Sequence, residues 1–386
     1  LIANGVHLVG RSFKYHRPRG FFGAGVDEPY AIVQMNRNNE VDPNVRATEQ
    51  ELFEGLEAKS VNCWPNVNFD IGAINNFLRM FFPAGFYYKT FMWPKSFWYK
   101  LYEPIIRKAA GFGSASIKHD KERYEHKYEY CDLLIAGSGP SGLASAYAAA
   151  KNGAKVILAE DKPRFGGSLL TDESSIGNQT GKEWANKIIS ELKSMKNVIV
   201  KNRSQVFGYY DHNMLVMSER VSDHLPKSNK YQPKQRLWYI RAKEVVISSG
   251  SIERPLVFGN NDTPGVILSS AAKEYLKVYG VLVGKKPLIF TNNDSGYETA
   301  IEFKKNGVEP IVLDTRKETS SEIINEAKNL NINIKFSHVV VVAKGYKKVK
   351  SADIAKISED KKKLSQLENI KCDCICVSGF WTPTIH

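Results

Sequence analysis

The feature that most constrains this chain is a glycine-rich segment at residues 137–142, which reads Gly-Ser-Gly-Pro-Ser-Gly. A short apolar run at 132–136 precedes it, and an alanine-rich, helix-prone stretch follows it. A second apolar run at 155–159 then ends at the acid Glu160. Strand, glycine turn, helix, strand and terminal acid come in the order that a dinucleotide-binding βαβ unit requires. The alternative, a glycine turn that binds nothing, is disfavoured because all five parts are present.

The three glycines of this segment have different predicted roles. Gly137 allows the tight turn, Gly139 lets the backbone approach a pyrophosphate at the helix N-terminus, and Gly142 lets the helix pack on the strand. Glu160 is predicted to accept hydrogen bonds from a ribose 2′-hydroxyl, and its charge disfavours a 2′-phosphate. The acid therefore favours NAD or FAD over NADP as the bound nucleotide.

Further small residues extend the predicted cofactor site. A glycine pair follows Glu160 closely, and two later predicted strands end in glycine. The complete predicted cofactor-binding set is Gly137, Ser138, Gly139, Pro140, Ser141, Gly142, Glu160, Asp161, Gly166, Gly167, Ser168, Gly250 and Gly379. No catalytic residue is identified, because the sequence shows no nucleophile–base pattern and hydride chemistry needs a cofactor.

Residues 286–316 repeat the strand–turn–helix–strand order and end near the acid Asp314. The turn of this second unit, at 292–296, lacks the glycine pattern. Asn292 and Asp294 would narrow the approach and place charge where a pyrophosphate would lie. We therefore predict a dinucleotide fold without a cofactor.

The N-terminal residues contain a different motif. Phe22, Asp27 and Tyr30 have the C-x4-C-x2-C spacing of plant-type ferredoxin loops, but none is a cysteine. The segment thus resembles a ferredoxin-like β-grasp domain that has lost its cluster ligands, the alternative being an ordinary glycine loop. Thiolates are needed to hold a [2Fe–2S] cluster, so none is predicted here. Three alternating cysteines at 372–376 could bind a metal, but a buried core strand is the favoured interpretation, and no metal site is predicted.

The predicted fold class is α/β, with an N-terminal ferredoxin-like unit followed by a flavoprotein-like Rossmann architecture of two dinucleotide-binding domains. The predicted boundaries are 1–60 for the ferredoxin-like unit, 61–127 for an aromatic connector, 128–285 with 340–386 for the first dinucleotide-binding domain, and 286–339 for an inserted second unit. The chain starts at Leu1 rather than a methionine, so we expect a fragment of a longer protein.

The connector and the overall charge bear on possible partners. Residues 81–102 are unusually aromatic, but no apolar run reaches the length of about 18 residues that would span a membrane. Packing between domains or against another subunit is therefore favoured, and no membrane partner is predicted. The net charge is +13, yet the basic residues are scattered and no nucleic-acid-binding motif is visible, so nucleic acid is not predicted. Five cysteines at irregular spacing argue against a disulfide framework, and a cytoplasmic location is expected.

Several segments together resemble the α subunit of heterotetrameric sarcosine oxidase: residues 1–6, 11–20, 83–91, the segment from Gly137, 291–295 and 381–384. The resemblance implies a heteromeric flavoenzyme that oxidatively demethylates sarcosine to glycine. It implies NAD in this chain, FAD in a β subunit, FMN at the α/β interface, further smaller subunits, and tetrahydrofolate in a C-terminal half that this chain lacks. The α subunits of opine, proline and cyanide-forming dehydrogenases share this architecture less closely.

Two rival functions stay open at this point. One is a self-contained FAD- and NADH-dependent reductase, which two βαβ units in series suggest and the altered second turn disfavours. The other is a non-catalytic scaffold whose NAD is structural. Disulfide-reductase chemistry is excluded on this chain, because no cysteine pair stands near the glycine segment.

Overall fold

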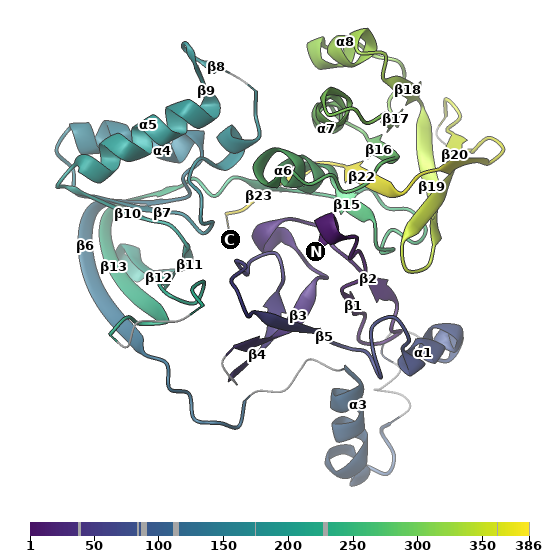
Figure 1. Ribbon diagram of the computed structural model, residues 1–386, viewed down its shortest axis with the longest axis horizontal. Helices are drawn as coiled ribbons and strands as arrows, with labels where there is room; N and C mark the ends of the chain where they lie inside the picture. The colour runs from purple at the N-terminus through teal and green to yellow at the C-terminus, as the bar shows by residue number, and fades with distance from the viewer. Residues whose placement is uncertain are drawn as a thin grey trace. The chain divides into compact units, whose positions relative to one another are not determined.

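The computed structural model of the chain describes residues 1–37, 40–82, 85, 91–110, 116–173, 175–226, 231–360 and 362–385. These residues form two compact units, which Figure 1 shows with their labelled elements. Unit 1 comprises Leu1–Gln50, Leu56–Lys118 and Glu253–Phe380, and unit 2 comprises Glu51–Gly55, His119–Ile252 and Trp381–His386. The chain crosses between the units after residues 50, 55, 118, 252 and 380, and the last two crossings lie at β14 (Ser251–Glu253) and β23 (Trp381–Pro383).

Unit 2 is built on a six-stranded sheet in the order β10-β7-β6-β13-β12-β11. Its strands are β6 (Tyr124–Ala136), β7 (Val156–Ala159), β10 (Val198–Lys201), β11 (Ser204–Tyr210), β12 (Met214–Arg220) and β13 (Gln235–Ile247). The first three are parallel to one another and to β13, whereas β11, β12 and β13 form an antiparallel meander. The glycine segment follows β6, at the carboxyl edge of the parallel strands, where ligands of such sheets bind.

Two helices cover one side of this sheet, α4 (Pro140–Lys151) and α5 (Gly181–Ser194) (Figure 1). The core beneath them includes Leu143 and Leu192, packed with Ile135 and Leu158 of the sheet, and all four are fully buried. A capping box starts α5: the Thr180 hydroxyl accepts from the Glu183 N–H, and the Glu183 carboxylate accepts from the Thr180 N–H. A small hairpin, β8 (Ser175–Ile176) and β9 (Gln179–Thr180), precedes this helix.

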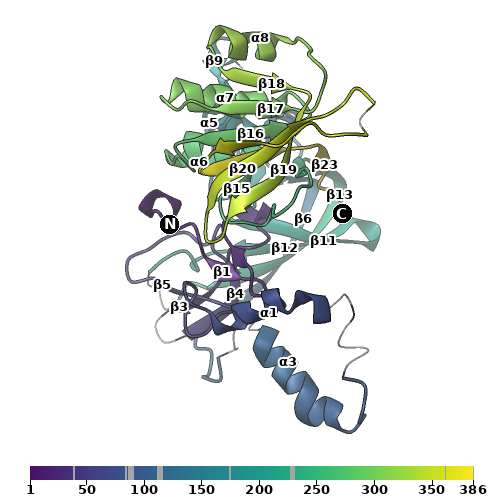
Figure 2. The ribbon, with the colours of Figure 1, turned by 90° about the vertical axis from the view of Figure 1, so that its right-hand side faces the viewer.

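Unit 1 contains a second parallel sheet, in the order β15-β22-β16-β17-β18. Its strands are β15 (Val266–Leu268), β16 (Pro287–Thr291), β17 (Ile311–Asp314), β18 (Asn333–Phe336) and β22 (Cys374–Ser378), and its helices are α6 (Ser269–Tyr279), α7 (Ser295–Lys305) and α8 (Glu322–Asn329). Three antiparallel strands, β19 (His338–Gly345), β20 (Val349–Lys356) and β21 (Glu368–Lys371), adjoin it (Figure 2).

The place of β22 differs from the predicted domain boundaries, which grouped 340–386 with the first dinucleotide-binding domain. In the structure β22 lies between β15 and β16, so β22 belongs to the second sheet, as does β15, which the prediction also grouped with the first domain. Every residue of β22 is buried, as expected of a central strand that is covered on both faces. The apolar pattern predicted such a strand, but it carries no information about which of two parallel sheets the strand joins.

The N-terminal part of unit 1 holds a three-stranded antiparallel sheet of β3 (Ile32–Arg37), β4 (Glu40–Arg46) and β5 (Glu57–Ser60), beside the short pair β1 (Gly10–Arg11) and β2 (Pro18–Arg19). Its small core consists of Val9, Phe21, Ala31, Val33 and Met35. This part packs directly against the second sheet, because the Leu268 N–H donates to the Phe22 carbonyl at 2.7 Å and Arg17 pairs with Asp262 at 2.7 Å.

The described parts of the connector contain α1 (Ile74–Phe77), a 3₁₀ turn (Arg79–Phe81), a π-helical turn (Trp98–Tyr102) and α3 (Glu103–Ala110). Its aromatic residues Trp93 and Tyr99 are each 82 % exposed. Phe86 and Tyr88, which the sequence also placed in this cluster, lie outside the described residues. No helix among the described residues is long and apolar enough to cross a membrane.

Candidate nucleotide site

The three glycines of the 137–142 turn differ in what the fold requires of them. Gly137 has a φ of +103°, and a Cβ atom there would lie 2.3 Å from the Ser248 carbonyl oxygen. A Cβ on Gly142 would lie 2.0 Å from the carbonyl oxygen of Gly137. A Cβ on Gly139, by contrast, would meet no protein atom within 4 Å. The fold itself therefore needs the outer two glycines, and the middle one leaves the backbone open to a ligand.

Helix α4 begins immediately after Gly139. Pro140 is its first residue, which suits a position whose N–H has no partner within the helix. Gly139 is the N-cap, and no side chain caps the helix. The positive end of the helix dipole is thus directed to the same edge of the sheet as the turn, which favours a bound phosphate.

The predicted ribose acid, Glu160, lies directly after β7 and is only 5 % exposed. One of its carboxylate oxygens, Oε2, accepts hydrogen bonds from the backbone N–H of Ser138 at 2.9 Å and from the Ser138 hydroxyl. The other oxygen, Oε1, accepts from the Lys162 backbone N–H at 3.0 Å. Burial, followed by the neighbouring Asp161 side chain, raises the pKa of Glu160 to about 7. The structure thus holds the carboxylate against the glycine turn.

The glycine pair after Glu160 closes on the same turn. The Gly166 N–H donates to the Ser138 hydroxyl at 3.1 Å, and a Cβ on Gly167 would lie 2.9 Å from the Cα of Gly139. Ser138 therefore links the turn, the acid and the glycine pair. The predicted set includes Ser138 as a residue of the glycine motif, and the sequence gives no sign of what its hydroxyl contacts.

Five of the remaining predicted residues also lie in unit 2. Asp161 follows Glu160 and is half-buried, whereas Pro140, Ser141 and Ser168 are exposed around the turn. Gly250, with a φ of +70°, lies after β13 in unit 2, and its carbonyl accepts from the Thr384 N–H.

Gly379 is separated from the other predicted residues, because it follows β22 in unit 1. Its N–H donates to the Arg254 carbonyl at 2.8 Å, and its own carbonyl accepts from the Asn293 side-chain amide. Gly379 therefore lies beside the second βαβ turn, and this difference follows from the place of β22 in the second sheet.

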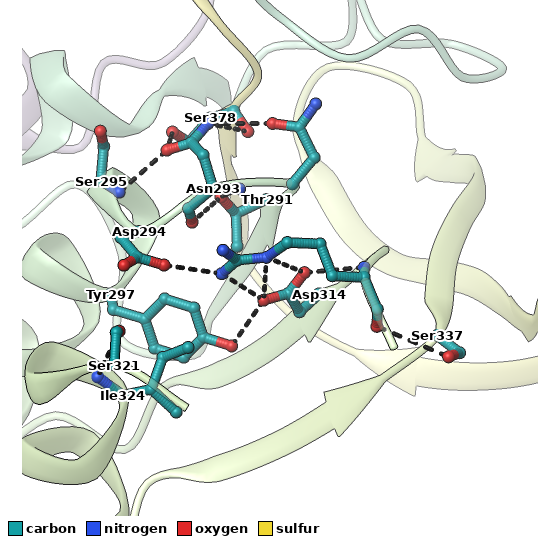
Figure 3. Close-up of polar contacts among 12 residues, drawn as sticks. Thr291, Asn293, Asp294, Ser295, Tyr297, Asp314, Ser321, Ile324, Ser337 and Ser378 are labelled. Atoms are coloured by element: carbon teal, nitrogen blue, oxygen red, sulfur yellow. Dashed lines mark hydrogen bonds and ion pairs between the residues drawn. The ribbon is translucent and has the colours of Figure 1, made fainter. Parts of the chain in front are cut away.

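The second βαβ turn surrounds its terminal acid with protein groups (Figure 3). Asp314, at the end of β17, is fully buried and accepts from the Tyr297 hydroxyl at 2.8 Å. Arg316 contacts Asp314 at 2.8 Å and also pairs with Asp294 of the turn at 2.8 Å. The hydrogen bond to Asp314 raises the pKa of Arg316, so this cation stays charged. The sequence predicted the altered turn but gave no sign of the arginine that holds it.

The ferredoxin-like loop does not fit an iron–sulfur cluster. Cys63 is the single cysteine among residues 1–63, whereas such a cluster is held by four thiolates. The rings of Phe22 and Tyr30, at two of the ligand-spaced positions, contact each other with centroids 5.4 Å apart. Within the described parts of the chain, no group of three or more metal-ligating side chains is placed to hold a metal ion.

The C-terminal cysteines do not fit a metal site either. Cys372, Cys374 and Cys376 are buried in the core of the second sheet. Burial raises the pKa of the Cys372 thiol to about 12, which keeps it protonated at neutral pH, whereas a metal ligand is a thiolate.

Comparison with known protein families matches two parts of the chain. Residues 1–63 match the 2Fe-2S iron-sulfur cluster binding domain, and residues 131–382 match the pyridine nucleotide-disulphide oxidoreductase family. The chain belongs to the pyridine nucleotide-disulphide oxidoreductase family. This confirms the predicted fold class and places the chain among oxidoreductases. Membership of this family also indicates binding of a flavin or pyridine nucleotide.

Individual relatives extend this result over the whole chain. The chain is 44 % identical over its full length to a sarcosine oxidase subunit alpha from Rhizobium meliloti, of which it covers 38 %. It is 30 % identical to a sarcosine oxidase subunit alpha from a Corynebacterium species, of which it covers 36 %. The L-proline dehydrogenase of P. horikoshii has the same fold, with a TM-score of 0.57 at 17 % identity over 98 % of this chain and 55 % of that one. The chain thus spans less than two-fifths of the length of these sarcosine oxidase relatives.

Proposed function

We propose that this chain binds NAD at the glycine turn of unit 2 and acts as the nucleotide-holding part of a heteromeric flavoenzyme that oxidatively demethylates sarcosine to glycine. The observation that carries the proposal is Glu160, held beside the turn by Ser138. The donors that the described residues bring to this carboxylate are backbone N–H groups and a hydroxyl, none of them cationic. A ribose hydroxyl can therefore share it without displacing an ion pair.

Different residues of the chain would bind different parts of the nucleotide. The backbone of the 137–142 turn and the N-terminus of α4 would hold the pyrophosphate, and Glu160 would hold the ribose. When bound, the nucleotide supplies the hydride-accepting chemistry that side chains lack. FAD is the alternative, since it carries the same adenosine diphosphate half and would use the same contacts.

The proposed substrate and the other cofactors come from the relatives rather than from the site. Two relatives that align with the entire chain are named sarcosine oxidase subunit alpha, which supports sarcosine as the substrate of the complete enzyme. FAD and FMN would then be held with a partner β subunit, and tetrahydrofolate would bind outside the region described here. A self-contained reductase is the second candidate, favoured only by the second βαβ unit, whose terminal acid is paired with Arg316.

The connector of unit 1 is the proposed contact with a partner subunit. Phe77, Trp93 and Tyr99 are each more than 80 % exposed, which is unusual for large apolar side chains on a lone soluble chain. Arg79, Lys95 and Lys100 lie within the same connector, so the partner surface is expected to be acidic.

Nucleotide binding to the purified chain tests the proposal. We expect the chain to bind NAD, and Glu160→Gln to weaken that binding by about 10- to 100-fold, because a charge-assisted hydrogen bond is lost. The matched control is Glu244→Gln, which changes an exposed glutamate on β13 and should leave binding unchanged. Equal affinity of the wild type and Glu160→Gln would refute the site, and a tightly bound FAD identified by mass spectrometry would favour the alternative.

A further inference from the structure

The ferredoxin-like loop is folded around a buried carboxylate that lies between the ligand-spaced positions. Glu28 is only 1 % exposed. Its Oε2 accepts hydrogen bonds from the backbone N–H groups of Phe22 at 2.7 Å and Gly23 at 2.8 Å. Its Oε1 accepts from Tyr30 at 2.6 Å and Ala31 at 2.9 Å. Four backbone donors from both ends of the loop thus converge on one side chain.

As in a cluster-binding loop, backbone N–H groups point to an anion at the centre of the loop. Here, however, the anion is a carboxylate. In iron–sulfur loops, hydrogen bonds reach the sulfurs of a cluster that thiolates hold. Here Phe22 and Tyr30, two of the ligand-spaced residues, direct their N–H groups to the Glu28 carboxylate instead. We propose that the Glu28 carboxylate takes the place of an iron–sulfur cluster as the anion around which this loop is built, and that the loop serves as a structural joint.

The outward side of the same loop supports the second half of the proposal. With the N–H groups turned inward, the carbonyl oxygens are available to neighbouring elements of unit 1. The Phe22 carbonyl accepts from the Leu268 N–H at 2.7 Å, and the Gly23 carbonyl accepts from the Tyr275 hydroxyl at 3.0 Å. Leu268 ends β15 and Tyr275 lies on α6, so the loop fastens the N-terminal sheet to the second parallel sheet.

The loop has little freedom to adopt another arrangement. A Cβ on Gly23 would lie 2.5 Å from the Asp27 carbonyl oxygen, so the backbone on the two sides of the loop is in close contact. The Thr48 hydroxyl, which comes from beyond β4, donates to the Gly25 carbonyl at 2.7 Å. Removal of the central carboxylate would therefore leave four N–H groups buried without an acceptor, rather than let the loop turn them to water.

The role of this loop in the enzyme does not depend on which nucleotide unit 2 binds. A loop centred on a carboxylate has no redox-active group, so this domain would pass no electrons. Its contribution would be to hold α6 and the second sheet in place.

The test uses the full chain and the variants Glu28→Gln and Glu28→Ala, with Glu57→Gln as the control. Glu57 is an exposed glutamate on β5 of the same domain. In Glu28→Gln, one side-chain oxygen becomes an amide nitrogen, so either the pair Phe22 and Gly23 or the pair Tyr30 and Ala31 loses its acceptor. Amide exchange of that pair should accelerate by at least about tenfold. The control should exchange as the wild type does.

Chemical rescue separates the charge of the side chain from its bulk. Formate should raise the thermal midpoint of Glu28→Ala, whereas formamide, its neutral counterpart of similar size, should not. Equal effects of the two compounds would overturn the role of the anion.

Two measurements on the wild type keep the test informative if the variants do not fold. Amide exchange at the four loop positions should be as slow as in the neighbouring strand β3, and rapid exchange there would overturn the proposal. Anaerobic incubation with iron and sulfide should leave the wild-type chain without a cluster, and one cluster per chain would equally overturn it.

Discussion

The two βαβ units of this chain have the same order of elements, but the groups that contact the terminal acid differ in charge. In unit 2, Glu160 is held by a hydroxyl and by backbone N–H groups. In unit 1, the corresponding Asp314 is held by Tyr297 and by the guanidinium of Arg316. When ionised, an acid whose donors are neutral has no internal cation as its partner, and its charge can act on a ligand. An acid paired with an internal cation is already neutralised within the protein. The two units share the βαβ order, so the feature that separates them is the partner of the terminal acid.

The two turns also differ in how easily a nucleotide phosphate could approach them. Gly139 of the first turn leaves its approach clear, whereas Asp294 of the second turn carries a charge that Arg316 neutralises. A nucleotide phosphate at the second turn would have to displace that carboxylate from its partner. We therefore propose that unit 2 is the binding unit, and the following predictions test this difference.

The largest expected effect comes from Gly142. Gly142→Ala places a Cβ 2.0 Å from the Gly137 carbonyl oxygen, so α4 must move away from β6. We expect a loss of about 3 kcal/mol in the free energy of unfolding. Gly139→Ala, the matched variant in the same turn, should change stability by less than about 1 kcal/mol and yet weaken nucleotide binding. Urea unfolding with parallel binding measurements distinguishes the two, and equal stability losses would contradict the assignment of roles.

The second prediction concerns Arg316. Arg316→Gln removes the cationic partner of the buried Asp314, and we expect a loss of about 2 kcal/mol, since Arg316 is itself partly exposed to solvent. Nucleotide affinity should stay unchanged, because the binding unit is the other one. A variant with reduced NAD affinity and normal stability would show that the second unit takes part in binding.

The third prediction is a dependence of binding on pH. The pKa of Glu160 is raised to about 7, so the carboxylate is mostly protonated at pH 6 and mostly ionised at pH 8. If the ionised form holds the ribose, NAD affinity should rise by about tenfold between these values. Calorimetric titration at several pH values measures this, with Glu160→Gln as a variant expected to show a flat profile.

The same raised pKa has the opposite effect on stability in the absence of nucleotide. Because the folded state binds the proton more tightly than the unfolded chain, the contribution of Glu160 is complete below its unfolded pKa and is lost as the pH rises through about 7. Unfolding of the nucleotide-free chain at the same pH values provides an independent check on the titration.

The smallest effect is expected from Ser138. Ser138→Ala removes the hydroxyl that joins Glu160 to Gly166 but keeps the backbone N–H bond to the acid. We expect nucleotide affinity to fall by about fivefold, the equivalent of one ordinary hydrogen bond. Ser190→Ala, an exposed position on α5 of the same unit, serves as the control. An affinity loss as large as that of Glu160→Gln would mean that the hydroxyl contacts the nucleotide directly.

The sequence predicted those features that depend on local order along the chain. The glycine pattern, the apolar strands and the terminal acid are periodic or contiguous, so the βαβ unit around Gly139 could be derived from them. The hydrogen bonds of the Ser138 hydroxyl and the ion pair of Arg316 with Asp314 could not be predicted from the sequence. Each depends on the direction of a side chain, which is set only when the chain folds. The membership of β22 in the second sheet was likewise out of reach, since its apolar residues fit either sheet equally well.

The packing of the N-terminal sheet against the second parallel sheet also has a consequence for biosynthesis. The Phe22 carbonyl and its donor Leu268 are separated by 246 positions along the chain (268 − 22). At typical translation speeds, the donor leaves the ribosome roughly 12 to 50 s after the acceptor. Throughout that interval the surface of the nascent N-terminal domain that packs on β15 and α6 has no counterpart, and exposed surface of this kind makes an unfinished chain prone to aggregation.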